Sequence, residues 1–362
     1  MRYIISITDS ISPTSMPFNE FVLFRKENYK NEKQIMIVLF ETTTNEKVTY
    51  PKDLEIFRIG KNIKKLNKVI KDIAAQAKVE NAELIFHIHE GKSVIFFNVA
   101  TRFKYIERIV YTLHSTYINY SLHNKIFAWI STFMCKYVVC VSKTSFKYFP
   151  KDLKKIFNNR IKYIQNGVDT ERVNKVFFKN KLEKRNRIFT LIYVARLVSL
   201  KRHEILFKAL TKLEDIQLFL VGNGPEESNL KEMIKQYDIF SKVKFLGVLS
   251  REDVYKTLMN CDCYVSSSSY EGLPISVLEA MYCGKPCIVS KIEQHCEVAE
   301  ECESLITVED NIERWELELL KMKNLSLDNL KKIGLNNRRD VGRKFSLKRM
   351  HENYSELYET FL

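Results

Sequence analysis

Short apolar runs that alternate with amphipathic segments constrain the fold of this chain more than any other feature. In the first half we expect strands at residues 3–7, 34–40, 83–88, 94–98, 108–113 and 137–141. Residues 61–78 between them predict an amphipathic helix whose apolar face consists of Ile63, Leu66, Ile70, Ile73 and Ala77. This alternation is typical of α/β domains with parallel sheets.

The same alternation restarts in the second half, after a polar and charged segment at residues 171–187 that we interpret as a linker. The predicted strands lie at residues 188–194, 217–221, 243–246, 263–266 and 286–290. The predicted helices lie between them, at residues 203–213, 226–237, 251–259 and 274–283. We therefore expect two α/β domains, at residues 1–170 and 171–345. Residues 346–362 should form a charged amphipathic helix that packs back on the first domain.

Charge and cysteine content limit the classes of function. The formal net charge of +14 predicts attraction to anions, which include nucleic acids, anionic membranes and phosphorylated small molecules. The eight cysteines include no CxxC pair, so we expect free thiols in a reducing cytoplasm. No window approaches the roughly 20 apolar residues of a membrane-spanning helix. Asp9 follows the first apolar run too closely for a signal peptide.

Two sets of residues that could bind phosphate follow predicted strands. In ARLVSLKRHEILF, Arg196 follows one strand and Lys201 opens the next helix, which is typical of a diphosphate site. Two solvated surface cations are the alternative. In VGNGPEE, Gly222 and Gly224 also follow a strand, but the third glycine of a dinucleotide fingerprint is absent. An ordinary tight turn explains this pair equally well.

Two carboxylates, Glu271 and Glu279, lie eight positions apart in EGLPISVLEAMYCGKP. Pro274 suits the first position of a helix, so Glu271 precedes that helix beside Gly272, where a ligand can approach the backbone. Glu279 falls at the edge of the buried stripe and needs hydrogen-bond donors there. The alternatives are favourable placement near a helix N-terminus for Glu271 and a partner on a neighbouring helix for Glu279.

These stretches all lie between residues 188 and 290, together with a further one, FLGVLSREDVYKTLMNCD. Their order and spacing resemble those of the same motifs in the retaining GT-B glycosyltransferases of family GT4. The first half is similar in TLHSTYINYSLH, which contains His114, and in VSKTSFKYF followed by IKYIQNGVD. The resemblance implies two Rossmann-like domains facing across a cleft. The first would bind the acceptor and the second would bind a nucleotide-sugar donor.

The resemblance also implies the residues of the site. Catalytic residues would be Glu271, His114, Arg196 and Lys201. Donor-binding residues would be Arg196, Lys201, Glu271, Gly272, Leu273, Glu279, Val248, Gly222, Ser15 and Met16. Arg196 and Lys201 would neutralise the departing diphosphate, Glu271 would bind the transferred sugar, and Glu279 would accept hydrogen bonds from the ribose. His114 would contact the 6-position of the sugar, with a buried core or turn histidine as the alternative.

One loop departs from the family pattern. Many members carry a Gly-Gly pair after the first strand, where this chain has Thr14, Ser15 and Met16 in SPTSMPFNEF. Side chains there make close approach to a phosphate harder, although the backbone donors remain. No Asp-x-Asp pair follows a strand, and Cys261-Asp262-Cys263 offers a single carboxylate. We therefore expect neither a metal ion nor a cofactor.

The expected reaction moves a hexose or N-acetylhexosamine from a UDP-sugar to a glycan or lipid-linked acceptor, in bacterial surface polysaccharide or lipopolysaccharide synthesis. GDP-mannose or another nucleotide sugar is an alternative donor. A basic nucleic-acid-binding protein is the alternative of another class, but no helix-turn-helix, RRM or zinc-finger pattern occurs, so we expect no nucleic-acid partner. Lysines at 61–78 and 151–163 suggest that the first domain docks on an anionic membrane, with an ordinary solvated face as the alternative. The expected location is the cytoplasm, peripheral to the inner face of the plasma membrane.

Overall fold

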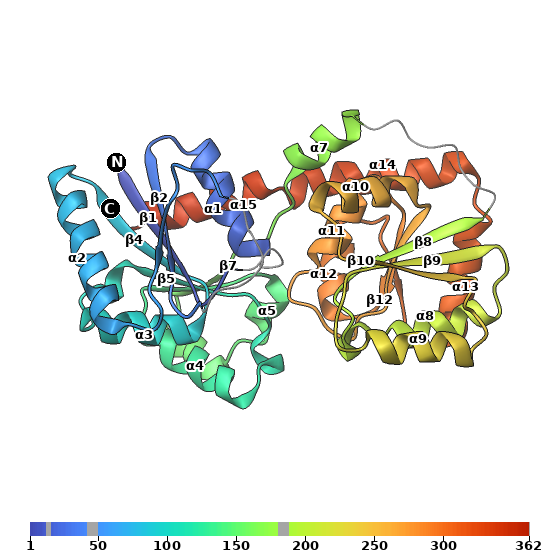
Figure 1. Ribbon diagram of the computed structural model, residues 1–362, viewed down its shortest axis with the longest axis horizontal. Helices are drawn as coiled ribbons and strands as arrows, with labels where there is room; N and C mark the ends of the chain where they lie inside the picture. Colours follow the sequence, from blue (N-terminus) through green and yellow to red (C-terminus); the bar gives the residue numbers. More distant parts are fainter. Residues whose placement is uncertain (12–15, 42–49, 180–187, 362) are drawn as a thin grey trace. The chain divides into compact units, whose positions relative to one another are not determined.

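The computed structural model describes residues 1–11, 16–41, 50–179 and 188–361 of the chain (Figure 1). It divides into two compact units, which we call unit 1 (Met1–Asn166 with Met350–Leu362) and unit 2 (Gly167–Arg349). Each unit contains one sheet in which every pairing is parallel, with helices connecting the strands. The prediction of two Rossmann-like α/β domains is confirmed.

Unit 1 contains a seven-stranded sheet with the order β3-β2-β1-β4-β5-β6-β7. Its strands are β1 (Arg2–Thr8), β2 (Glu32–Val38), β3 (Glu55–Arg58), β4 (Glu83–Ile88), β5 (Ile109–Leu113), β6 (Tyr137–Cys140) and β7 (Ile161–Tyr163). Its α-helices are α1 (Met16–Asn28), α2 (Ile63–Val79), α3 (Gly91–Thr101), α4 (Leu122–Thr132), α5 (Lys143–Lys147), α6 (Lys151–Ile156) and α15 (Leu347–Glu359). The strand order reverses beside β1, so the carboxyl ends of β1 and β4 are where a ligand of this unit is expected.

The C-terminal helix α15 packs on unit 1 through residues beyond Met350. Arg25 of α1 is completely buried and donates a hydrogen bond to the carbonyl of His351 at 3.3 Å. The hydroxyl of Tyr358 lies 2.6 Å from Nδ1 of His87 on β4, and that of Tyr354 lies 3.0 Å from Thr112 on β5. Buried polar contacts of this kind fix the helix in one register on the sheet.

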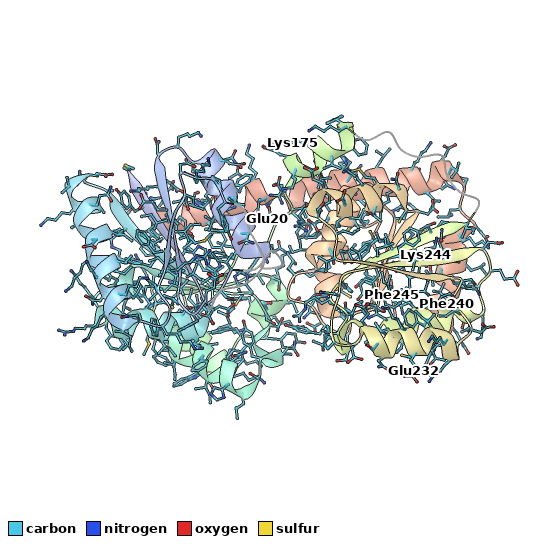
Figure 2. The ribbon with its side chains drawn as sticks, in the orientation of Figure 1. Glu20, Lys175, Glu232, Phe240, Lys244 and Phe245 are labelled. Carbon is cyan, nitrogen blue, oxygen red and sulfur yellow. The ribbon has the colours of Figure 1, made fainter. Side chains whose placement is uncertain are left out.

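Unit 2 contains a six-stranded sheet with the order β10-β9-β8-β11-β12-β13. Its strands are β8 (Phe189–Val194), β9 (Ile216–Val221), β10 (Val243–Gly247), β11 (Cys263–Ser266), β12 (Cys287–Ser290) and β13 (Ile306–Val308). Its α-helices are α7 (Thr170–Lys179), α8 (His203–Thr211), α9 (Glu227–Gln236), α10 (Arg251–Asn260), α11 (Ile275–Tyr282), α12 (Glu293–Glu301), α13 (Ile312–Lys323) and α14 (Leu327–Lys344). Edge strand β10 presents the exposed Lys244, which discourages pairing with another strand (Figure 2).

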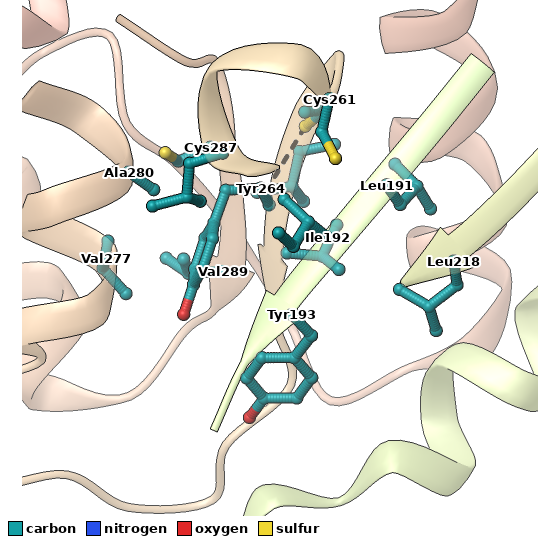
Figure 3. Packing of buried hydrophobic residues seen from close by; sticks show 14 of the residues in the cluster. Leu191, Ile192, Tyr193, Leu218, Cys261, Tyr264, Val277, Ala280, Cys287 and Val289 are labelled. Atoms are coloured by element: carbon teal, nitrogen blue, oxygen red, sulfur yellow. Dashed lines mark hydrogen bonds between the residues drawn. The ribbon is translucent and has the colours of Figure 1, made fainter. Parts of the chain in front are cut away.

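The core of unit 2 forms where α11 lies against the central strands (Figure 3). Val277 and Ala280 of α11 are fully buried together with Tyr264 of β11 and Val289 of β12. The helix is buried almost all round, from Val277 to Tyr282, and is not confined to one apolar stripe. Any polar side chain in that stretch must therefore find its partners inside the protein.

Two predictions of local structure are wrong. Residues 94–98 are not a strand but part of α3, which is buried through Val94 and Phe97. A short apolar run cannot distinguish a buried strand from a buried helix, and the approach of α3 to α4 decides the outcome. The predicted linker at 171–187 begins instead with α7, whose Val173 and Val176 are buried. Residues 180–187 lie outside the described part of the chain.

Among the described residues, no helix is both long enough and apolar enough to span a bilayer.

Candidate functional site

Two charged residues of the predicted site are in direct contact in unit 2. Lys201 follows β8 and Glu271 follows β11, and these strands are neighbours in the sheet. The Nζ atom of Lys201 lies 2.5 Å from Oε1 of Glu271, and both side chains are mostly buried, at 18% and 14% exposure. Ser268 donates a second hydrogen bond to the same oxygen at 2.7 Å. The ion pair therefore engages Oε1 and leaves Oε2 as the acceptor available to a ligand.

The serine run before Glu271 positions the turn that contains Lys201. Ser267 donates hydrogen bonds to the carbonyls of Lys201 and Arg202, at 3.0 and 2.9 Å. The backbone N–H of Ser269 donates to the carbonyl of Leu200 at 2.9 Å. Arg202 takes a left-handed conformation at φ 48°, which redirects the chain into α8. No role was predicted for these serines, although they lie between a predicted strand and Glu271 in the sequence.

The two glycines of VGNGPEE allow close packing against the loop that contains Arg196. A Cβ atom on Gly222 would lie 2.0 Å from the carbonyl oxygen of Ala195, and one on Gly224 would lie 2.2 Å from that of Leu197. Backbone hydrogen bonds join the same loops, including one from Leu197 to the carbonyl of Asn223 at 2.8 Å. Gly222 also has a φ of +131°, which residues with a side chain rarely adopt. Glycine is therefore required at both positions for close packing beside the cations, and the predicted donor-binding role of Gly222 stays a prediction.

Arg196 itself is exposed, and within the described residues its guanidinium has no acidic partner. It stands on the loop that leaves β8, in the same connection as Lys201. An unpaired cation at the carboxyl end of a parallel strand is suited to bind an anionic ligand.

Glu279 is held by a neighbouring helix, which is one of the two alternatives that the sequence left open. Its carboxylate is 3% exposed and pairs with Arg251 of α10, with Nη2 to Oε1 at 2.9 Å and Nη1 to Oε2 at 3.1 Å. Tyr255 of α10 donates to Oε1 at 2.8 Å. Oε1 therefore accepts a hydrogen bond from Tyr255 and also contacts Nη2 of Arg251, whereas Oε2 accepts a single hydrogen bond from Nη1, so Oε2 keeps acceptor capacity for a ligand.

The other predicted donor residues lie in different surroundings. Gly272 is half-buried and Leu273 is 6% exposed, just before α11. Val248 is 62% exposed and directly follows β10. Ser15 lies outside the described residues, and Met16 is described only as the first residue of α1, so its side chain has no assigned place. Their predicted roles stay predictions.

His114 lies in unit 1, just after β5, in a stack of histidines that the sequence analysis missed. Its Nε2 lies 2.9 Å from Nδ1 of His89, and the two rings are stacked with centroids 5.2 Å apart. His89 stacks in turn on His87 at 4.3 Å. Burial lowers the pKa of His114 to about 4 and holds the pKa of His89 well below its ordinary value. Both imidazoles are therefore neutral at pH 7 and can donate or accept a hydrogen bond. The H-x-H spacing in FHIHE on an alternating strand was the available signal.

Among the described residues, no group of three or more His, Cys, Asp or Glu side chains could hold a metal ion. The carboxylate of Asp262 contacts the start of β8 instead, because its Oδ2 accepts a hydrogen bond from the backbone N–H of Thr190 at 2.8 Å. The neighbouring Cys261 is buried, and desolvation raises the pKa of its thiol to about 12. A protonated thiol is a poor metal ligand.

The chain is similar to known proteins over most of its length. A family model described as Glycosyl transferases group 1 matches residues 174–340, and one described as Glycosyltransferase Family 4 matches residues 37–172. UDP-Gal:alpha-D-GlcNAc-diphosphoundecaprenol alpha-1,3-galactosyltransferase of Escherichia coli is 25% identical over 295 residues, which are 76% of this chain and 74% of that protein. GDP-mannose-dependent monoacylated alpha-(1-6)-phosphatidylinositol monomannoside mannosyltransferase of Corynebacterium glutamicum is 29% identical over 176 residues, 44% of this chain and 43% of that protein.

The fold is also that of solved glycosyltransferases. The crystal structure of a glycosyltransferase from Rickettsia africae superimposes with a TM-score of 0.80 and 20% identity, covering 99% of this chain and 98% of that one. The two family models match adjoining segments that correspond to the two parallel-sheet units. The chain is therefore a glycosyltransferase that belongs to family GT4 and has the GT-B fold.

Proposed function

We propose that this glycosyltransferase moves a hexose or N-acetylhexosamine from a UDP-sugar to a glycan or lipid-linked acceptor, with retention of anomeric configuration. The observation that carries the proposal is the Lys201–Glu271 pair at the carboxyl ends of two adjacent strands, with the exposed Arg196 in the same connection as Lys201. This arrangement supplies cations for a diphosphate and a carboxylate oxygen for a sugar hydroxyl at one edge of the sheet.

In this proposal Lys201 and Arg196 stabilise the leaving group. As the bond between the anomeric carbon and the phosphate oxygen breaks, negative charge grows on the diphosphate, and fixed cations lower the energy of that state. The acceptor oxygen forms its new bond on the same face of the sugar, and its proton passes to the departing phosphate oxygen. No protein base is needed. The two side-chain cations meet the need for positive charge, so the proposal involves no metal ion or cofactor.

Glu271 would bind the transferred sugar through Oε2, because Lys201 and Ser268 already occupy Oε1. Its negative charge would also favour positive charge on the sugar ring in the transition state. The backbone N–H groups of Gly272 and Leu273 are adjacent donors. Glu279 would accept a ribose hydroxyl at Oε2, the oxygen with a single partner. His114, neutral through burial, would bind a hydroxyl of the sugar.

The identity of the base and acceptor rests on the relatives. The Escherichia coli relative is named for UDP-Gal and a diphosphoundecaprenol acceptor, and its match covers most of both chains, which supports a UDP-sugar and a lipid-linked acceptor. The pathway would then be surface polysaccharide or lipopolysaccharide synthesis, at the inner face of the plasma membrane. GDP-mannose is the second candidate donor, supported by the shorter match to the corynebacterial mannosyltransferase.

A panel of nucleotide sugars tests the choice of donor. The purified full chain is incubated with UDP-, GDP- and ADP-sugars and polyprenyl-diphosphate-linked saccharide acceptors, and released nucleotide and product are measured. The proposal expects UDP release that depends on the acceptor, with an α-linked product from an α-linked donor by NMR. Preferential release of GDP would mean that the donor is a GDP-sugar, while the type of reaction would stand. Consumption of no nucleotide sugar with any acceptor, or a β-linked product from an α-linked donor, would contradict the proposal.

A further inference from the structure

A stripe of exposed apolar side chains runs along helix α4 of unit 1. Leu122, Ile126, Trp129 and Phe133 are 76%, 49%, 47% and 43% exposed, at spacings that place them on one face of the helix. The opposite face packs on α3, its neighbour in Figure 1, and Ser131 there donates to the carbonyl of Gly91 at 2.8 Å. Helix α4 is therefore amphipathic, but its large apolar side chains face outward and not toward the core.

The stripe continues onto the end of α6. The ring centroids of Trp129 and Phe133 lie 4.8 Å apart, and Phe133 packs edge-on against Phe157 at 5.0 Å. Ile156, next to Phe157, is 64% exposed. We call the set Leu122, Ile126, Trp129, Phe133 and Ile156 the α4 surface. Exposed apolar groups that lie side by side in this way can mark an interaction site, unlike single exposed apolar residues, which are ordinary.

The stretch of sequence that contains helix α4 is basic and has no acidic residues. No Asp or Glu occurs between Glu107 and Asp152. That stretch contains the basic residues Arg108, Lys125, Lys136, Lys143, Lys147 and Lys151. Lys125 lies on the same face as the stripe, three residues after Leu122 and four before Trp129. On α6, Lys151 and Lys155 are exposed together with the one acidic residue of that helix, Asp152.

We propose that the α4 surface docks on an anionic lipid bilayer, with Trp129 and Phe133 in the interfacial layer and Lys125, Lys151 and Lys155 at the headgroups. Tryptophan and phenylalanine beside lysine are the side chains that favour that layer. A second copy of the chain fits less well, because a symmetric contact would bring the lysines of one surface against those of the other.

This inference deepens the proposed function, because a lipid-linked acceptor would lie in the bilayer. The lysines of residues 61–78 and of 151–163 were both expected to dock, and the two sets differ in the structure. Helix α2 does expose lysines, but four apolar residues of its face are buried in the core: Leu66, Ile70, Ile73 and Ala77. It therefore offers charge without a continuous apolar stripe. Of the lysines at 151–163, in contrast, Lys155 directly precedes Ile156 of the α4 surface.

Tryptophan fluorescence tests the docking directly, since the chain has only two tryptophans. Trp129 is exposed in unit 1, whereas Trp315 is completely buried in unit 2. The full chain is mixed at low salt with vesicles of phosphatidylglycerol and phosphatidylcholine whose acyl chains are brominated. We expect quenching of Trp129, and the variant Trp129→Phe should bind with its remaining fluorescence unquenched. Binding without quenching of Trp129, or no binding to these vesicles, would overturn the proposal.

Matched substitutions locate the surface. The triple variant Lys125→Gln, Lys151→Gln and Lys155→Gln should lose affinity for the vesicles by roughly a hundredfold. The control removes the same charge from α2, as Lys64→Gln, Lys68→Gln and Lys71→Gln, and should lose far less. Ile126→Ser should weaken binding at least tenfold, whereas Phe240→Ser, at a 75% exposed site in unit 2, should not.

Equal losses of vesicle affinity in each variant and its control would contradict the assignment of the α4 surface. Self-association of the chain in the absence of lipid, abolished by Ile126→Ser, would also contradict it. The thermal shift produced by UDP is measured in parallel. A variant that loses vesicle binding but keeps that shift separates docking from donor binding. Absence of a shift with any nucleotide, in a chain that still docks, would count against the proposed reaction and not against this surface.

Discussion

Two buried histidines should make unit 2 unstable in mild acid. His203 is 2% exposed and His295 is completely buried. Desolvation lowers the pKa of each imidazole from an ordinary value of 6.5 to about 4, assisted at His203 by the charge of Lys201. At His295 the charge of Glu271 opposes the shift without cancelling it. Both side chains therefore stay neutral in the folded protein at a pH where the unfolded chain is already protonated.

The sign and size of the effect follow from this difference. The unfolded state binds more protons than the folded state between about pH 6.5 and pH 4, so the free energy of unfolding falls as the pH drops through that window. At pH 5 each histidine contributes a loss of about 2 kcal/mol, and the pair a loss of about 4 kcal/mol. That is a large part of the 5–15 kcal/mol that is typical of the stability of a domain.

Urea unfolding monitored by Trp315 measures the effect in the full chain. The variant Trp129→Phe leaves Trp315 as the single tryptophan, so its fluorescence reports on unit 2. Between pH 7.5 and pH 5 the free energy of unfolding should fall by about 4 kcal/mol more than in a variant that also carries His203→Leu and His295→Asn. Asparagine can keep the hydrogen bond of His295 to the carbonyl of Ser290. Equal pH dependence of the free energy of unfolding in the two proteins would refute the reasoning. An NMR titration of the histidines would then show which imidazole keeps an ordinary pKa.

Two further predictions concern the packing around the site. Gly222→Ala should lower the free energy of unfolding of unit 2 in urea by well over about 2 kcal/mol, because the new Cβ would lie 2.0 Å from the carbonyl oxygen of Ala195. Gly247→Ala is the control, at φ +66° with open space around it, and should cost only about 1–2 kcal/mol. Equal costs of the two substitutions would contradict this prediction. Arg251→Met should lower the free energy of unfolding by about 2 kcal/mol, because it leaves the buried carboxylate of Glu279 without its cation. Adding Glu279→Gln should recover part of that loss. Strictly additive effects of the two substitutions would mean that the pair is not coupled.

The sequence predicted the sheets and the order of the site segments because both depend on local patterns. Apolar runs separated by amphipathic helices define parallel α/β units, and charged residues placed just after strands must gather at one sheet edge. Arg196, Lys201 and Glu271 were selected as candidates in this way. Their direct contact was not, because a hydrogen bond between residues 70 positions apart leaves no trace in periodicity.

The errors also have physical causes. Residues 94–98 were assigned to a strand because an apolar run of that length suits either a buried strand or a buried helix. The partner of Glu279 could not be predicted, since Arg251 at the start of α10 has the spacing of an ordinary solvent-exposed residue. The histidine stack escaped notice because His87 and His89 are separated from His114 by a whole helical connection. The exposed stripe on α4 needed the structure to show that its neighbours leave it uncovered.

The rate of sugar transfer by Glu271→Gln tests the central claim most directly. Glutamine keeps the size of the side chain but removes the charge that pairs with Lys201 and that we propose binds the sugar. The account predicts that kcat for nucleotide release with acceptor falls by about 10²–10³, in the range found when one group that stabilises transition-state charge is lost. The dissociation constant for UDP, measured by calorimetry, should change only a few fold, because UDP lacks the transferred sugar. Wild-type turnover by Glu271→Gln would contradict the account.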